Sequence, residues 1–245
     1  MPADFEPGNY RYIPGVFQYS AGVAAAPGYE VRRVRFHEPV PLARGFERAA
    51  HYISAAGRSL TAFCACELRS PTPFTEDGFR AFNESYVTTL RAWGLFDGRI
   101  NPVARSNVCP EIDPPPEPSF HAFGFTVAAP RAAPSFVIAG SGEAPEGRGS
   151  YAAHIVRRGE AGAMREKARF VLAEMERRLG LLGFAWADTM ATQVYTVRDL
   201  YPFLADEIVR RGAAHAGLTW QFCRPPVREL EFEMDCRGIA TEQII

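Results

Sequence analysis

Two hydrophobic periodicities alternate along the first half of the chain, and their order predicts strands interleaved with helices. Residues 30–36 (EVRRVRF) and 59–70 (SLTAFCACELRS) alternate polar and apolar positions, as half-buried strands do. Residues 43–57 and 72–94 instead repeat apolar side chains every three or four positions and end in glycine, which is typical of amphipathic helices. A short strand, VARSNV at 103–108, closes this half.

The second half repeats this order of elements. Strands are predicted at 120–129 and 135–143 as a hairpin pair, a helix at 162–183, a strand at 188–197, a helix at 199–212, and strands at 217–222 and 229–236. The match is in element order and not residue by residue. We interpret it as an internal duplication of about 110 residues, a period to test before separate folds are assumed. Each unit reads as α+β, with helices packed on one face of a mainly antiparallel sheet.

These elements suggest boundaries for the units. We expect an N-terminal arm at 1–30, a divergent first unit at 31–109 and a second unit at 120–245. Between the units, residues 110–119 (PEIDPPPEPS) are half proline and predict a stiff linker.

The composition is that of a soluble globular protein, with 47% hydrophobic and 22% charged residues. A formal net charge of −1 offers no bulk field for nucleic acid or an anionic membrane. The N-terminus lacks the apolar core of a secretory signal, and no stretch approaches the ~20 apolar residues of a membrane span. We therefore expect a cytoplasmic protein that binds neither nucleic acid nor membrane.

The five cysteines predict free thiols and no metal site. Their number is odd, and the spacing of Cys64 and Cys66 is too short for a zinc hairpin. The glycine-rich stretch GSGEAPEG at 140–147 lacks the GxGxxG spacing of nucleotide-binding loops. We expect no metal and no cofactor.

Several segments of the second half resemble the Rid superfamily, the YjgF-like reactive intermediate deaminases. They are SFVIAGSGEAP at 135–145, LGLLGFAWADTMATQVYTVRDLYPF at 179–203 and RPPVRELEFEMDC at 224–236. The first half is similar from about residue 43 to 109, where an Asn-x-x-Tyr on a helix precedes an Ala-Arg-Ser-x-Val strand. The resemblance implies two tandem chorismate-mutase-like units. It also raises a duplicated, 2-aminomuconate-deaminase-like member as a possibility.

The resemblance divides the family's functional positions between the halves. In the first half, Arg105 matches the arginine that grips a substrate carboxylate, and Asn83 matches the asparagine lining the same cleft. In the second half, Ser141 stands at the Ser-Gly turn and Glu231 matches an acidic residue that handles water or a proton. The second half has no arginine at the corresponding position, near Ala216. A duplicated chain that keeps one wall in each half would still build a complete pocket.

Other positions depart from the family or add to the candidate site. Phe125 stands where relatives often carry tyrosine, and Asn107 replaces a cysteine found two residues after the arginine. Arg224 is a candidate second anion contact, and Cys223 a candidate lining residue. Each has a simpler interpretation, since buried cysteine is usually a small hydrophobe and Arg224 can equally cap a carbonyl.

The resemblance implies a hydrolase acting on C–N bonds, an enamine or imine deaminase of the 2-aminomuconate type from aromatic catabolism. Arg105 would bind the carboxylate while Glu231 orients water for addition to the C=N carbon. The expected partners are a small-molecule carboxylate and two further copies of the chain, since Rid proteins are trimers. Glu231 is one of four alternating acids at 229–235, and three of them are expected to face solvent.

Two alternatives remain open at this point. Chorismatases also join a Rid-like C-terminal half to a divergent N-terminal half, and they hydrolyse an enol ether. The departures at Phe125, Asn107 and Ala216 also leave room for a non-catalytic protein that binds small carboxylates.

Overall fold

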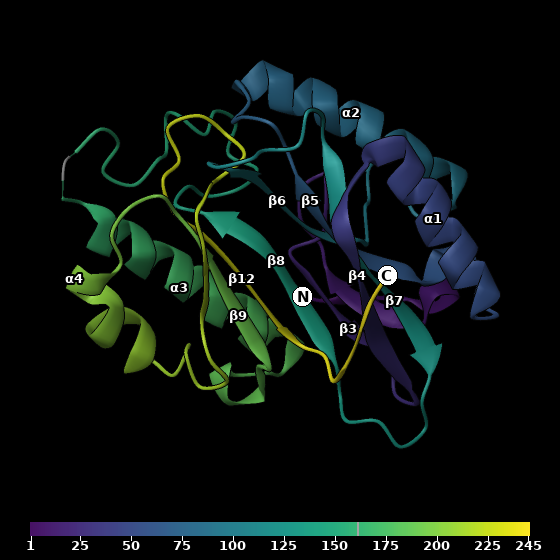
Figure 1. Ribbon diagram of the computed structural model, residues 1–245. Helices are drawn as coiled ribbons and strands as arrows, with labels where there is room; N and C mark the ends of the chain where they lie inside the picture. The colour runs from purple at the N-terminus through teal and green to yellow at the C-terminus, as the bar shows by residue number, and fades with distance from the viewer. Residues whose placement is uncertain (161) are drawn as a thin grey trace.

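The computed structural model describes residues 1–160 and 162–245, and within them two β-sheets lie between two pairs of helices (Figure 1). The first sheet has the strand order β11-β6-β5-β7-β4-β13. Its strands are β4 (Tyr29–Pro41), β5 (Phe63–Arg69), β6 (Ala104–Pro110), β7 (Ser119–Ala128), β11 (Cys223–Arg224) and β13 (Thr241–Ile244). Helices α1 (Leu42–Ala55) and α2 (Glu76–Ala92) lie on its outer face.

The second sheet has the order β1-β2-β3-β8-β12-β9-β10. Its strands are β1 (Ala3–Phe5), β2 (Tyr10–Ile13), β3 (Gly22–Ala25), β8 (Phe136–Gly142), β9 (Ala191–Tyr195), β10 (Thr219–Gln221) and β12 (Glu233–Gly238). Helix α3 (Met164–Leu182) packs on β8 and β12, away from the first sheet. The short helix α4 (Tyr201–Phe203) continues into a wider π-helical turn, Leu204–Val209. Single turns of 3-10 helix occur at Glu6–Gly8, Leu60–Ala62 and Trp186–Asp188.

The same topology occurs twice, as the repeated order of elements predicts. In the first unit the chain runs β4-α1-β5-α2-β6-β7, and β7 inserts antiparallel between β4 and β5. In the second unit it runs β8-α3-β9-α4-β10-β12, and β12 inserts antiparallel between β8 and β9. In each unit the last helix connects two parallel strands, β5 to β6 and β9 to β10. The predicted α+β class with mainly antiparallel sheets is confirmed.

Strand pairing crosses the boundaries that the sequence suggests. The predicted hairpin of 120–129 with 135–143 is wrong, because β7 lies in the first sheet and β8 in the second. Residues 1–30 contribute β1, β2 and β3 to the second sheet, and β13 at the C-terminus returns to the first. Alternation of polar and apolar residues indicates that a strand has one buried face, but it does not predict which strand is its neighbour.

Local sequence explains where the main helices begin and end. Thr75 caps α2 by accepting a hydrogen bond from the Gly78 amide (3.1 Å), and Glu76 and Asp77 follow in the first turn. Helix α3 ends at Gly183, whose φ of 81° is a left-handed conformation that glycine adopts without steric cost. The α-helix predicted at 199–212 is interrupted, since only three residues are α-helical before the π-helical turn.

Each helix pair covers its own apolar core, and the sheets meet over a more polar layer. Phe63, Phe120 and Phe123 fill the core beneath α1 and α2, whereas Val171 and Phe232 belong to the core beneath α3. Between the sheets, β6 approaches β8 and β3 approaches β4. Charged and hydrogen-bonding side chains line part of this contact, and the candidate site lies within it.

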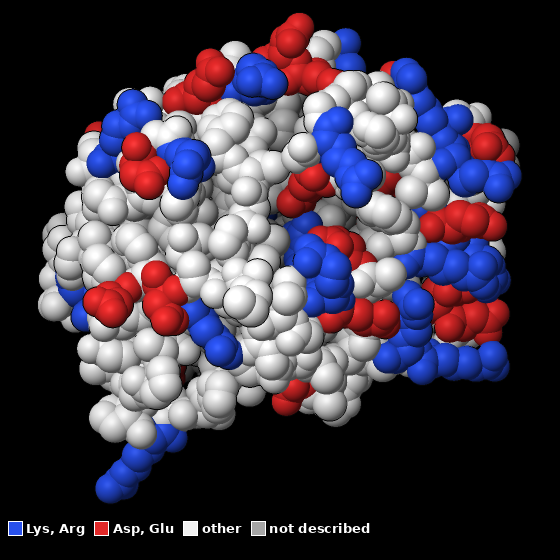
Figure 2. Space-filling view, turned by 180° about the vertical axis from the view of Figure 1, so that it is seen from behind, with Lys and Arg blue, Asp and Glu red and all other residues white. Residues whose placement is uncertain are grey.

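The outer surface shows no segregation of charge on the face drawn in Figure 2, where basic and acidic side chains are interspersed beside broad uncharged areas. No helix within residues 1–160 and 162–245 combines the length and apolar character needed to cross a membrane.

Candidate functional site

The guanidinium of Arg105 is buried, and its two terminal nitrogens lack a hydrogen-bonding partner in the described part of the chain. Arg105 lies on β6 and is 2% exposed, yet its Nη1 and Nη2 atoms have no partner among residues 1–160 and 162–245. Four aromatic rings surround it, with centroids at 5.1 Å (Tyr19), 5.7 Å (Phe79), 5.7 Å (Phe82) and 4.7 Å (Tyr86). Cation–π attraction offsets part of the cost of burying this charge, but it satisfies none of the N–H donors. The arrangement therefore provides a binding site for an anion.

A cavity opens beside this guanidinium between the two sheets. Arg105 and Asn107 come from β6 of the first sheet. Gly140 and Gly142 of β8 and Glu233 of β12 come from the second. Both walls of the cavity thus belong to a single chain. The sequence predicts a pocket with one wall from each half, and this cavity has that form.

Glu233 brings a buried acid to the wall opposite β6. Its side chain is 4% exposed, and no hydrogen bond or ion pair to its carboxyl group occurs within the described ranges. Burial raises the pKa of this carboxyl group well above its usual value, and the nearby charges of Asp235, Glu146 and Glu143 raise it further. Arg105 opposes this shift without cancelling it. Burial and the neighbouring acids thus both favour the protonated form of Glu233.

Gly140 makes room for the Glu233 carboxyl group. A Cβ atom at Gly140 would lie 2.2 Å from Oε1 of Glu233, well inside van der Waals contact. The absence of a side chain on β8 therefore fixes where the acid can rest.

Asn107 places a third unpaired donor at the cavity. Its Oδ1 accepts a hydrogen bond from the Ser70 hydroxyl (3.0 Å), which leaves Nδ2 without a partner within the described part of the chain. The side chain is buried and lines the cavity that Arg105 lines. The position that the sequence marks as a departure from relatives therefore carries a donor suited to an anion or a carbonyl oxygen.

Asn83 lies next to the site without lining the cavity. It is buried on α2, where its Nδ2 donates to the Phe79 carbonyl oxygen (2.7 Å), and its Oδ1 has no partner among the described residues. Since Phe79 lines the cavity, Asn83 contacts the site through its helix.

Ser141 and Phe125 point away from the cavity. The Ser141 hydroxyl accepts a hydrogen bond from Nη2 of Arg178 on α3 (3.2 Å). Gly140 and Gly142, its neighbours on β8, face the cavity, because successive residues of a strand face opposite sides. Phe125 is buried in the core of the first unit, with its ring centroid 5.9 Å from that of Tyr52.

The structure places the Glu231 carboxylate outside the cavity. It forms ion pairs with Lys167 (3.0 Å) and Arg198 (2.6 Å) and is 24% exposed. Burial favours a higher pKa for Glu231, but hydrogen bonds from Lys167 and Arg198 outweigh it and lower the pKa. The Glu143 carboxylate also accepts hydrogen bonds from the backbone amides of Glu231 (2.6 Å) and Phe232 (3.0 Å). These contacts hold the segment that precedes β12, and the strand itself begins at Glu233.

Cys223 and Arg224 lie on β11, beside β6 but away from the cavity. Burial against Val108 and Tyr195 raises the pKa of the Cys223 thiol, which keeps it protonated. Arg224 is partly exposed and forms a two-point ion pair with Glu111 (2.5 and 2.7 Å). No group of three or more His, Cys, Asp or Glu side chains within 1–160 and 162–245 is arranged to hold a metal ion.

Comparison with a known family extends over almost the whole chain. Residues 2–243 match the family described as 2-aminomuconate deaminase CnbZ. The chain belongs to this family. A protein of Comamonas testosteroni named 2-amino-5-chloromuconate deaminase is 51% identical over 245 residues, which cover 98% of each chain. The resemblance to a 2-aminomuconate-deaminase-like Rid protein is thereby confirmed.

Solved structures show the fold alone. A chorismatase is 12% identical and matches with a TM-score of 0.51, over 89% of this chain and 77% of that one. The YjgF gene product of Escherichia coli is 14% identical, with a TM-score of 0.32, over 43% of this chain and 80% of that one. At this identity, the similarity to the chorismatase supports the architecture and does not imply a shared activity.

Two residues of the cavity, Glu233 and Asn107, have no site role in the sequence prediction. Glu233 is one of four alternating acids, and the alternation alone cannot separate it from Glu231. Its distinguishing signal is its place opposite Gly140, which depends on strand register. Asn107 was visible only as a departure from relatives.

Proposed function

We propose that this chain is a deaminase that hydrolyses the enamine or imine form of 2-aminomuconate or of a closely related unsaturated amino dicarboxylate. The observation that carries the proposal is that the Arg105 guanidinium, whose terminal nitrogens have no partner among the described residues, shares one cavity with the buried Glu233 carboxyl group. Membership of the 2-aminomuconate deaminase family and the relative named 2-amino-5-chloromuconate deaminase support the same substrate class.

In this proposal, Arg105 and Asn107 bind the carboxylate next to the amino-bearing carbon. Nη1 and Nη2 of Arg105 form a planar pair of donors that matches the two oxygens of a carboxylate, and Nδ2 of Asn107 adds a third donor. Binding of the carboxylate gives the buried Arg105 charge a partner and so removes the free-energy cost of leaving it unpaired.

Glu233 supplies the proton that the enamine requires. Its neutral carboxyl group donates a proton to a carbon of the conjugated chain, which converts the C=C–NH₂ unit into a C=NH₂⁺ iminium. Water then adds to the iminium carbon, and the Glu233 carboxylate takes back a proton from that water. The resulting carbinolamine transfers its hydroxyl proton to nitrogen and releases ammonia, which leaves a 2-oxo acid.

Water is the only co-reactant in this sequence, so the proposal places the enzyme among hydrolases of C–N bonds. Electrostatic positioning suffices, because an iminium carbon is already electrophilic. The predicted homotrimer stays a prediction.

Ammonia release tests the proposal directly. The purified chain is expected to release one ammonia for each freshly generated 2-aminomuconate consumed, measured in a coupled assay alongside loss of the substrate's ultraviolet absorbance. The same preparation is expected to release no pyruvate from chorismate. Pyruvate without ammonia would favour the enol-ether alternative, and tight carboxylate binding without either product would leave a binding protein.

Asn107→Asp is expected to weaken substrate binding without removing the Ser70 contact. The aspartate still accepts from Ser70, but it presents an anionic oxygen where Nδ2 stood, next to the substrate carboxylate. A lost charge-assisted hydrogen bond together with like-charge repulsion should raise KM by about 10- to 100-fold.

Asn107→Ala is the matched control, because it removes the donor without adding charge, and its KM should rise less. Steady-state kinetics separate the two effects. Equal KM values for Asn107→Asp and wild type would exclude Asn107 from carboxylate binding.

A further inference from the structure

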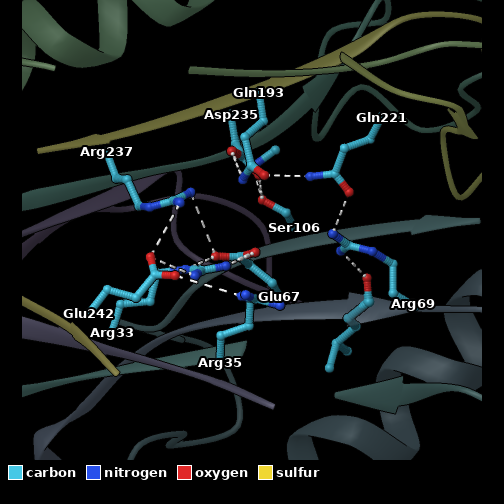
Figure 3. Close-up of polar contacts among 12 residues, drawn as sticks. Arg33, Arg35, Glu67, Arg69, Ser106, Gln193, Gln221, Asp235, Arg237 and Glu242 are labelled. Carbon is cyan, nitrogen blue, oxygen red and sulfur yellow. Dashed lines mark hydrogen bonds and ion pairs between the residues drawn. The ribbon is translucent and has the colours of Figure 1, made fainter. Parts of the chain in front are cut away.

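A second buried acid, Asp235, connects the two sheets next to the candidate site. Oγ of Ser106 on β6 donates to Oδ2 of Asp235 on β12 (2.6 Å), and this contact crosses from the first sheet to the second. Tyr195 and Gln193 of β9 also donate to Asp235, at 2.8 and 2.9 Å. Figure 3 shows Asp235 at the centre of this group, with Ser106 below it and Gln193 beside it.

The contact is only one or two residues away from each group of the proposed mechanism. Ser106 follows Arg105 on β6, and Asp235 lies two residues after Glu233 on the same face of β12. Gly140 joins them from β8, since its amide donates to Oγ of Ser106 (3.1 Å) and its lack of a side chain leaves room for the Glu233 carboxyl group. Movement at Ser106 or Asp235 therefore shifts both walls of the cavity.

The two acids of β12 have opposite environments. Burial, followed by the nearby charge of Glu67, raises the pKa of Asp235, although three hydrogen bonds favour its ionised form. Glu233 receives none within the described residues and rests against Gly140 and the cavity. Asp235 is therefore the acid that the surrounding side chains hold in place, whereas Glu233 faces the cavity.

We propose that Asp235 is the positioning residue of the deaminase site, because its bond to Ser106 holds β12 against β6 so that Glu233 faces the substrate bound by Arg105. This inference rests on the proposed function. When it is ionised, Asp235 has a second effect, since its charge disfavours ionisation of Glu233.

Other charges also face Glu233 and must be considered in any pH profile. Glu143 and Glu146 follow β8 and act in the same direction as Asp235, whereas Arg105 acts in the opposite direction. The remaining titratable groups around Glu233 are Cys109 on β6, Tyr151 and Cys223. All of these groups stay in place in the variants described next, so differences between variants report Asp235 and Ser106.

Asp235→Asn and Ser106→Ala separate charge from position. Asp235→Asn keeps the shape of the side chain but removes its charge, so the limb on which kcat falls with rising pH should move to lower pH. Ser106→Ala breaks the contact between the sheets and leaves the charge, so this limb should stay where wild type has it. Ser106→Ala should lower kcat by about 10- to 100-fold, because the acid is displaced from its target, whereas Asp235→Asn should change kcat mainly through the shift of this limb. KM should change little in either, since Arg105 and Asn107 are untouched.

Glu242→Gln is the control. Glu242 belongs to the other part of the network in Figure 3, where it pairs with Arg33 (2.8 Å) and Arg35 (3.6 Å). Its loss removes an acid from the same layer without touching Asp235. The variant should retain the wild-type kcat and pH profile.

Infrared titration of the protonated carboxyl band provides a readout that does not need turnover. The band assigned to Glu233, by its loss in Glu233→Gln, should titrate at lower pH in Asp235→Asn than in wild type. An unchanged midpoint and an unchanged kinetic limb in Asp235→Asn would overturn the charge effect, and an unchanged kcat in Ser106→Ala would overturn the positioning role. If wild type released no ammonia while the infrared midpoint still moved, the proposed function would fail and the effect of Asp235 on Glu233 would stand.

Discussion

Replacing Arg105 with methionine is expected to abolish most deamination while leaving the protein at least as stable as wild type. Truncating one partner of a buried, hydrogen-bonded charge pair typically costs about 2–5 kcal/mol. For the carboxylate of the substrate, this corresponds to a fall in kcat/KM of roughly 30- to 5000-fold. Most substitutions of buried catalytic residues destabilise a fold. The expected retention of stability in Arg105→Met is therefore the more distinctive result.

Stability should not fall because the free protein buries an unpaired charge at this position. An apolar side chain of similar length removes that desolvation cost, and such replacements are often neutral or stabilising by about 1–4 kcal/mol. Contacts with the rings of Tyr19, Phe79, Phe82 and Tyr86 are largely retained by methionine, whose thioether packs well against aromatic edges.

Urea unfolding together with kcat/KM measurements tests both halves. Arg224→Met is the matched control, since this arginine is partly exposed, paired with Glu111 and absent from the cavity. It should keep near-wild-type kinetics. A large loss of stability in Arg105→Met would contradict the unpaired state of the guanidinium, and unchanged kinetics would contradict its role in binding.

Glu233→Gln is expected to lower kcat by about 10²–10⁴-fold with little change in KM, because the amide fills the same space but has no acidic proton to donate. The wild-type pH profile should show the same group. Glu233 acts in its protonated form, so kcat should fall as pH rises through its raised pKa. This limb should be missing from the residual activity of Glu233→Gln.

Glu231→Gln gives the sharpest comparison, since it makes the same chemical change two residues earlier. The Glu231 carboxylate pairs with Lys167 and Arg198 and does not reach the cavity. Its kcat should stay within a few-fold of wild type, while the melting temperature falls because buried Lys167 loses one of its two partners. The reverse result, with Glu231→Gln inactive and Glu233→Gln active, would move the proton-transfer role to Glu231.

The helices and their ends could be predicted from sequence because their signals are local. The 3.6-residue periodicity and terminal glycine at 162–183 predict α3, which spans Met164–Leu182. The sheet membership of 119–128 could not be predicted in this way. Its alternation fits either sheet, and only packing against α1 and insertion between β4 and β5 decide the matter.

In the candidate site too, some residues could be predicted from local sequence and others could not. Arg105 was identifiable because the Ala-Arg-Ser-x-Val string marks it in the sequence. Choosing between Glu231 and Glu233 requires knowing that β12 starts at Glu233, and this depends on the Glu143 carboxylate binding the backbone amides just before the strand. A contact 88 residues apart in sequence thus determines which acid enters the cavity.

Drawing both cavity walls from one polypeptide has an evolutionary consequence. In a ring of identical subunits, one mutation changes every active site at once. The change appears on the side of each site to which the mutated residue belongs. Here the β6 side and the β8–β12 side are encoded by separate codons of one gene. Selection can therefore retain the anion-binding residues of β6 while Val227 or Leu230 on the facing side is substituted to admit differently substituted substrates.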